Sequence, residues 1–202
     1  MFEREPITAG KLMDKQFLPK PLIVEGMLPT GTYILAGTMK IGKSFLMTQL
    51  CWSVAEGTPF LGLTTRKSTV LYLALEDTQA RLQSRLARMF GTDWSGSEFH
   101  LLFQINQQGD ALIQQFQDFI LAHPDTRLIV IDTLQRVRES DGSSYSYSYD
   151  YETIMPLKTF ADAYDIALIV VHHTRKNEGD DNLFNQISGT NGLRLFRARV
   201  WQ

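Results

Sequence analysis

The sequence reads Gly37-Thr38-Met39-Lys40-Ile41-Gly42-Lys43-Ser44 after an apolar run and before a segment of helical periodicity. This is the G-x-x-x-x-G-K-S pattern, which is typical of a loop whose backbone N–H groups surround a phosphate. The run Thr32–Ala36 predicts a strand before the loop, and apolar residues spaced from Phe45 to Val54 predict a helix after it. Because the motif requires a strand and a helix in this order, we interpret the stretch as a phosphate-binding loop rather than a chance turn.

Each part of this loop suits a different part of a bound nucleotide. The glycines allow backbone N–H groups to point at the β-phosphate, and the start of the helix adds the positive end of its dipole. Lys43 would place its charge against the β- and γ-phosphates, while the Ser44 hydroxyl would be a ligand of Mg²⁺. The predicted nucleotide-binding residues are Gly37, Thr38, Met39, Lys40, Ile41, Gly42, Lys43, Ser44 and Phe45.

The composition is that of one well-packed domain. The chain has 202 residues, of which 44% are hydrophobic and 21% charged, and we expect a lead at residues 1–21 followed by one domain at 22–202. A net charge of -2 argues against a uniformly basic surface for nucleic acid. One cysteine, Cys51, excludes a disulfide framework, and no apolar run has the length of a membrane span. Because the N-terminal residues also lack the apolar region of a signal peptide, we expect a cytoplasmic protein with no membrane partner.

Apolar runs alternate with helical patterns along the remaining sequence. Strands are predicted at Leu22–Val24, Thr32–Ala36, Thr69–Leu75, Phe99–Phe103, Leu128–Ile131 and Ala167–Val171. Helices are predicted over about 43–56 and around the apolar stripes Leu82–Phe90, Leu112–Ile120 and Ile154–Tyr164. The runs 128–131 and 167–171 are apolar on both faces, which indicates strands covered on both sides. We therefore predict an α/β fold, a mostly parallel sheet with helices on both faces and with ligands at the carboxyl ends of its strands.

Acidic residues follow two of the predicted strands, at the edge of the sheet where the phosphate-binding loop is expected. Asp132 comes directly after the run 128–131, where a carboxylate would hold Mg²⁺ through water; taken alone, it fits a turn or cap residue equally well. Glu76 follows the strand 69–75, and its carboxylate would position and polarise the water that attacks the γ-phosphate. Its neighbour Asp77 would instead cap the next helix, and the alternative for both is an exposed carboxylate pair.

A histidine pair, His172 and His173, follows the strand 167–171 at the same edge. An imidazole near the γ-phosphate would report whether ATP or ADP is bound and pass that state to the loop after it. The alternative is that both side chains only hydrogen-bond to backbone carbonyls. A metal site formed by the pair is disfavoured because adjacent strand residues point to opposite faces. Both histidines remain candidates for the sensing role.

Two polar segments, Ser143–Tyr151 and Asn177–Asn185, are predicted as loops. Serine alternates with tyrosine in the first, so Tyr145, Tyr147 and Tyr149 would offer stacking faces to single-stranded bases. The alternative is a flexible connector, which is the commoner use of such a stretch.

Four short motifs occur in order along the chain and read GTMKIGKS, YLALED, LIVIDT and VVHHTRK. Together they resemble the RecA-like AAA family ATPases of the RepA type, which occur on plasmids, phages and integrated elements. The resemblance extends from near Leu22 to Leu193. It implies a RecA-like P-loop fold that uses ATP and Mg²⁺, a hexameric ring with ATP between its subunits, and replicative helicase activity on single-stranded DNA.

The same resemblance implies a role for each predicted site residue. Lys43 and Ser44 would bind phosphate and Mg²⁺, Glu76 would be the hydrolytic carboxylate, and Asp132 would support the metal. Either His172 or His173 would fill the sensor position.

The C-terminal sequence departs from the family pattern. After Ser188-Gly189-Thr190 the family continues through small residues and an aspartate into another strand, whereas here the residues are large and Ala198 stands at the expected aspartate. We therefore expect a shortened or altered C-terminus, in which the arginine that reaches a neighbouring subunit is not identifiable.

Two functions follow from these features. The leading hypothesis is a Mg-ATP-dependent motor, a replicative helicase or helicase-like ATPase of a mobile element. The alternative is a nucleotide-binding regulatory module of a replication protein with little or no turnover. A small-molecule kinase is disfavoured, because the sequence shows no arginine-bearing lid and Glu76 favours water as the acceptor.

Overall fold

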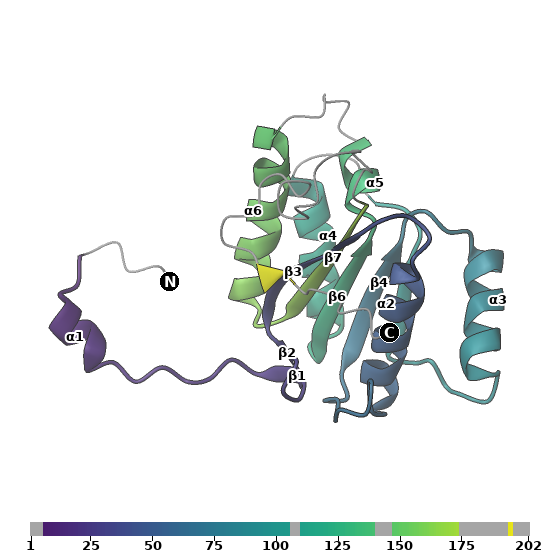
Figure 1. Cartoon of the computed structure of the whole chain (residues 1–202), viewed down its shortest axis with the longest axis horizontal. Helices are drawn as coiled ribbons and strands as arrows, with labels where there is room; N and C mark the ends of the chain where they lie inside the picture. Colours follow the sequence, from purple (N-terminus) through teal and green to yellow (C-terminus); the bar gives the residue numbers. More distant parts are fainter. Residues whose placement is uncertain (1–5, 106–109, 140–146, 174–193, 196–202) are drawn as a thin grey trace.

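The computed structural model describes residues 6–105, 110–139, 147–173 and 194–195, and a parallel sheet is its central element (Figure 1). Among these residues the strand order is β5-β4-β6-β7-β3-β8, and every neighbouring pair is parallel. The strands are β3 (Gly31–Gly37), β4 (Thr69–Ala74), β5 (Phe99–Leu102), β6 (Thr126–Asp132), β7 (Ala167–His173) and β8 (Arg194–Leu195). The predicted α/β class with a parallel sheet is confirmed.

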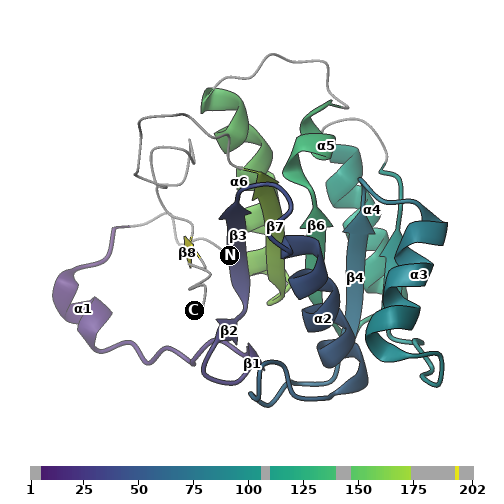
Figure 2. The same ribbon diagram turned by 45° about the vertical axis from the view of Figure 1, so that its right-hand side comes forward.

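Helices cover both faces of this sheet (Figures 1 and 2). One face carries α2 (Lys43–Glu56) and α3 (Gln79–Phe90), and the other carries α4 (Asp110–Ala122) and α6 (Tyr147–Ala163). We call these the α2 face and the α6 face. A short helix, α5 (Leu134–Glu139), follows β6 directly at the carboxyl end of the sheet. No helix that the structure describes has the length and apolar character needed to cross a membrane.

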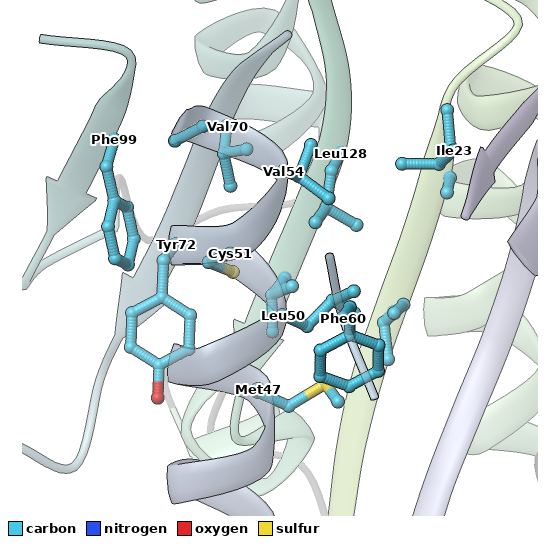
Figure 3. Close-up of a cluster of buried hydrophobic side chains, with 14 of the residues drawn as sticks. Ile23, Met47, Leu50, Cys51, Val54, Phe60, Val70, Tyr72, Phe99 and Leu128 are labelled. Carbon is cyan, nitrogen blue, oxygen red and sulfur yellow. The ribbon is translucent and has the colours of Figure 1, made fainter. Parts of the chain in front are cut away.

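The strands send alternate side chains into two separate apolar clusters. Along β4, Val70 and Tyr72 lie in the α2-face cluster, whereas Leu71 and Leu73 lie in the α6-face cluster. Figure 3 shows part of the α2-face cluster, in which Cys51 of α2 lies beside Tyr72. Because successive residues of a strand point to opposite faces, this alternation also determines the face on which each polar residue at a strand end is displayed.

The polypeptide before the sheet forms α1 (Ala9–Met13) and a small antiparallel pair, β1 (Leu22–Val24) with β2 (Leu28–Pro29). The sequence predicts only β1. Helix α1 is short and buries no residue, and in Figure 1 the segment that carries it extends away from the sheet. Nearer to β1, the ammonium group of Lys20 lies 3.2 Å from the carboxylate of Asp162 on α6.

Several predicted strand ends shift by a few residues. Strand β4 ends before Leu75 and β5 before Phe103, whereas β3 and β7 continue to Gly37 and His173. The two longer strands keep their pairing to the end, because Gly37 and His173 lie opposite each other in the parallel register. The ends of β3 and β7 are therefore aligned at the edge where ligands are expected.

The prediction of a loop over Ser143–Tyr151 is wrong for its second half, because α6 already begins at Tyr147. A helix anchored by its buried stripe, here Ile154 and Leu157, extends into flanking residues at little further cost, since propagation is easier than nucleation. The side chains of the serine and tyrosine residues in this segment lie outside the described part of the chain, as does the predicted loop Asn177–Asn185.

We expect Phe116→Ala to lower the free energy of unfolding by about 3–5 kcal/mol. Phe116 is fully buried on α4, and its ring centre lies 5.6 Å from that of Phe160 on α6, so truncation would leave a cavity in the α6-face cluster. Denaturant unfolding followed by circular dichroism measures the change. The matched control is Leu121→Ala on the same helix, where the side chain is 76% exposed and the expected change is below about 0.5 kcal/mol. Equal losses in the two variants would contradict this account of the core.

Candidate active site

Predicted residues from separate parts of the sequence meet on the α2 face at the carboxyl ends of the strands. Each of three predicted residues lies two positions after a member of the α2-face cluster. They are Asp132 at the end of β6, His173 at the end of β7, and Glu76 just after β4. Alternation of side chains along the strands directs Asp132 and His173 toward α2. Lys43 is the first residue of α2 itself. The four residues are therefore gathered by the topology of the sheet around the start of one helix.

The loop between β3 and α2 ends in a glycine whose conformation its path requires. Gly42 has a φ of 90°, a left-handed conformation that favours glycine, and it is the N-cap residue of α2. At Gly37 an added Cβ atom would lie 2.6 Å from Cδ1 of Ile41, the end of a side chain that is 56% exposed, so Ile41 would have to move. The first N–H groups of a helix have no acceptor within it, and here they follow directly on the loop. This arrangement suits an anionic ligand.

Lys43 lies inside this loop rather than in solvent. It is 6% exposed, and its ammonium group donates hydrogen bonds of 2.8 Å to the carbonyl oxygens of Gly37 and Thr38. Burial lowers the pKa of Lys43, and the nearby charges of Asp132 and Glu76 oppose that shift. An anionic ligand at this position would form stronger hydrogen bonds with the ammonium group than the neutral carbonyl oxygens do.

Glu76 is held by side chains from two other strand ends. The Thr133 hydroxyl donates a hydrogen bond of 2.7 Å to Oε1 of Glu76, and Nε2 of His173 lies 3.6 Å from Oε2. The distance between His173 and Glu76 is longer than a hydrogen bond. The two side chains form an ion pair when the imidazole is protonated. The side chain of Glu76 is still 39% exposed, so water can reach a carboxylate whose position is constrained.

Asp132 is the buried acidic residue of the site, with 5% of its surface exposed. Its Oδ2 accepts a hydrogen bond of 2.6 Å from the hydroxyl of Tyr72 on β4. Burial raises the pKa of Tyr72 well above its ordinary value, and the charge of Asp132 and the hydrogen bond to it act in the same direction. The peptide bond between Asp132 and Thr133 is cis.

The structure separates the two histidines. In the pairing of β3 with β7, His172 lies opposite Ala36 and His173 lies opposite Gly37. Because neighbouring strand residues point to opposite faces, His173 shares the α2 face with Glu76 and His172 does not. Among the described residues, Nδ1 of His173 is buried without a hydrogen-bond partner.

Asp77 does not cap α3, so that prediction is wrong. The N-cap is Thr78, whose hydroxyl accepts a hydrogen bond from the backbone N–H of Arg81. Asp77 instead forms a 2.6 Å ion pair with Arg85, because this buried arginine needs an anionic partner. The guanidinium group of Arg85 also lies 4.9 Å from the ring centre of Phe45 on the first turn of α2. Asp77 and Phe45 are thus connected through one arginine at the rim of the loop.

Sequence reasoning misses two residues that contact the predicted acidic groups, Tyr72 and Thr133. Thr133 is adjacent to Asp132 but has no motif of its own. Tyr72 reads as an ordinary strand residue within an apolar run. One sequence signal could have pointed to Tyr72: a tyrosine in a buried strand needs a hydrogen-bond partner for its hydroxyl. The identity of that partner depends on which strand lies alongside.

The donor atoms gathered here suit a nucleotide with Mg²⁺. Ser44 and Asp132 offer the oxygen ligands that Mg²⁺ prefers, and Lys43 with the start of α2 offers positive charge to phosphate. Within the described ranges, no group of three or more His, Cys, Asp or Glu side chains would hold a metal ion by itself.

Together, the parallel sheet and the loop define a RecA-like P-loop NTPase fold. The structure is similar to that of the KaiC-like protein PH0186 from the hyperthermophilic archaeon Pyrococcus horikoshii OT3, with a TM-score of 0.58 and 19% sequence identity. The similarity covers 77% of this chain and 67% of that chain, and at this identity it supports the fold alone. In sequence, residues 2–179 match the AAA domain family, and the chain belongs to that family. No curated protein matches it in sequence.

Proposed function

We propose that this domain binds Mg-ATP and hydrolyses the bond to its γ-phosphate. The observation that carries the proposal is the convergence of Lys43, Glu76, Asp132 and His173 beside the phosphate-binding loop. A cation, a partly exposed carboxylate, a buried carboxylate and an imidazole in one place match the parts that hydrolysis of a nucleotide requires.

In this proposal the loop holds the phosphates of ATP. Backbone N–H groups within residues 37–45 donate to the β-phosphate, and Lys43 replaces its bonds to the carbonyls of Gly37 and Thr38 by bonds to phosphate oxygens. Ser44 and Asp132 hold Mg²⁺, the second through water. The metal ion, when bound, neutralises negative charge on the phosphates.

Glu76 positions the water that attacks the γ-phosphate. Thr133 occupies Oε1, so the carboxylate is fixed with Oε2 on the side of His173. A carboxylate constrained in this way orients a water molecule and accepts its proton as the bond from the water oxygen to the γ-phosphorus forms. The bond between the γ-phosphorus and the β–γ bridging oxygen breaks in the same step, and ADP leaves with that oxygen. His173, rather than His172, is the sensor in this proposal, because its Nε2 lies 3.6 Å from Glu76 at the end of β7.

We also infer that hydrolysis drives a motor on single-stranded DNA, as in a replicative helicase of a mobile element that works as a hexameric ring. The support for this part is the resemblance of the four ordered motifs to RepA-type ATPases, together with the RecA-like fold.

Single-stranded DNA is therefore expected to stimulate ATP turnover. The measurement is steady-state hydrolysis with and without an oligonucleotide at several salt concentrations, since binding to the DNA backbone weakens as salt rises. Sedimentation with and without ATP tests for a nucleotide-dependent ring. If the rate of hydrolysis is the same with and without DNA at every salt concentration, the motor proposal is wrong and only the ATPase proposal stands. ATP binding without turnover would favour the regulatory module instead.

A further inference from the structure

The hydroxyl of Tyr72 is buried within an apolar cluster yet lies against the acidic residue of the site. Tyr72 is 1% exposed, and its ring makes an edge contact with Phe99 at 6.3 Å between ring centres. Figure 3 shows the ring between Phe99 and Cys51 of α2. Its hydroxyl donates a buried hydrogen bond of 2.6 Å to Oδ2 of Asp132.

The register of β4 and β6 brings these two residues together. Tyr72 lies opposite Val130, and Ala74 lies opposite Asp132. Because residues two apart in a strand share a face, Tyr72 and Asp132 are diagonal neighbours on the α2 face. A long aromatic side chain can reach such a diagonal neighbour.

Packing alone does not explain the hydroxyl. Phenylalanine would fill the same space between Phe99 and Cys51, and a buried hydroxyl costs free energy unless it has a partner. Asp132 is 5% exposed and, as a buried carboxylate, needs hydrogen-bond donors. The bond between the two groups therefore meets both requirements at the metal-supporting position of the proposed site.

We propose that Tyr72 is a positioning residue that holds Oδ2 of Asp132, so that Oδ1 is presented to a Mg²⁺-bound water; this inference rests on the function proposed above. Partners that orient metal-supporting groups alter metal affinity by about 10–100-fold when they are removed. Since Asp132 acts through water in this proposal, we expect an effect at the lower end of that range.

The test is Tyr72→Phe, which removes the hydroxyl and keeps the ring. Equilibrium binding of a fluorescent ATP analogue is measured with excess EDTA and then over a range of Mg²⁺ concentrations. We expect the Kd without metal to equal that of the wild type, and the tightening produced by Mg²⁺ to be about tenfold weaker. A merely structural role would shift both values together. The same Mg²⁺-dependent tightening in variant and wild type would overturn the proposal.

The matched control is Tyr33→Phe, which removes the same atom from a buried tyrosine on β3. Tyr33 donates a hydrogen bond of 2.7 Å to the carbonyl of Pro29, near the amino end of its strand, so its loss should leave the response to Mg²⁺ unchanged. Circular dichroism of both variants separates a loss of folding from a loss of metal response. A response that falls equally in both variants would overturn the assignment to Tyr72.

A double-mutant cycle tests whether Tyr72 acts through Asp132. In the Asp132→Asn background, Tyr72→Phe should weaken the Mg²⁺ response little further, because the carboxylate that it orients is already gone. This background also removes the unpaired buried charge, so it provides a folded comparison if the single variant is unstable. Full additivity of the two substitutions would overturn the proposal.

Binding measurements on the wild-type protein distinguish a failure of this inference from a failure of the proposed function on which it rests. If wild-type protein does not bind the ATP analogue, the proposed function and the role of Tyr72 are both overturned. If Mg²⁺ tightens binding to the wild type and does so equally in Tyr72→Phe, only the role of Tyr72 is overturned.

Discussion

The Glu76→Gln variant is expected to bind ATP as the wild type does and to hydrolyse it about 10²–10⁴-fold more slowly. An amide is a poor proton acceptor, so the attacking water would lose the group that polarises it. The substitution keeps the size of the side chain, and the amide oxygen can still accept the hydrogen bond from Thr133. Single-turnover hydrolysis and equilibrium binding of ATP measure the two quantities separately.

A suitable control for this variant is Glu56→Gln, which removes the same charge from the opposite end of α2. Its turnover should equal that of the wild type. Asp77 is not a substitute for Glu76, because it is already paired with Arg85 at 2.6 Å. Wild-type rates in Glu76→Gln would mean that another group activates the water, and the role proposed for Glu76 would be withdrawn.

The Lys43→Ala variant is expected to lose ATP affinity and to hydrolyse what it still binds about 10²–10³-fold more slowly. In the proposed function the ammonium group of Lys43 contacts the phosphates directly, and alanine leaves only the backbone N–H groups and the metal ion to balance their charge. The fold should survive the substitution. The pKa of Lys43 is lowered because burying its charge costs free energy, and alanine removes that cost. Isothermal titration with ATP, single-turnover hydrolysis and the thermal unfolding midpoint measure these three results.

Lys67→Ala provides the comparison, since it removes an exposed lysine away from the loop and should leave binding unchanged. A Lys43→Ala protein that binds ATP normally would show that the loop does not hold phosphates in the proposed way. A large fall in the unfolding midpoint would show instead that the hydrogen bonds to Gly37 and Thr38 stabilise the loop more than burial of the charge costs.

Much of the fold is predictable because its signals are local. The phosphate-binding loop, the helix Lys43–Glu56 and the runs that become β4, β6 and β7 follow from glycine spacing and from apolar periodicity over short windows. The rule that ligands bind at the carboxyl ends of parallel strands then places Glu76, Asp132 and the histidine pair at one edge. The loop prediction over Ser143–Tyr151 fails at Tyr147, because the extent of a helix also depends on the packing that anchors it.

Residue chemistry and local periodicity thus determined the class of fold, the phosphate-binding loop and the acidic residues at the strand ends. Only the tertiary structure decided which of these groups are partners. Tyr72 reaches Asp132 because β4 lies beside β6 in a particular register, and His173 rather than His172 faces Glu76 because of its place in β7. The physical reason is that hydrogen bonds and ion pairs form over a few ångströms, whereas strand order and register are set by the burial of the whole apolar core.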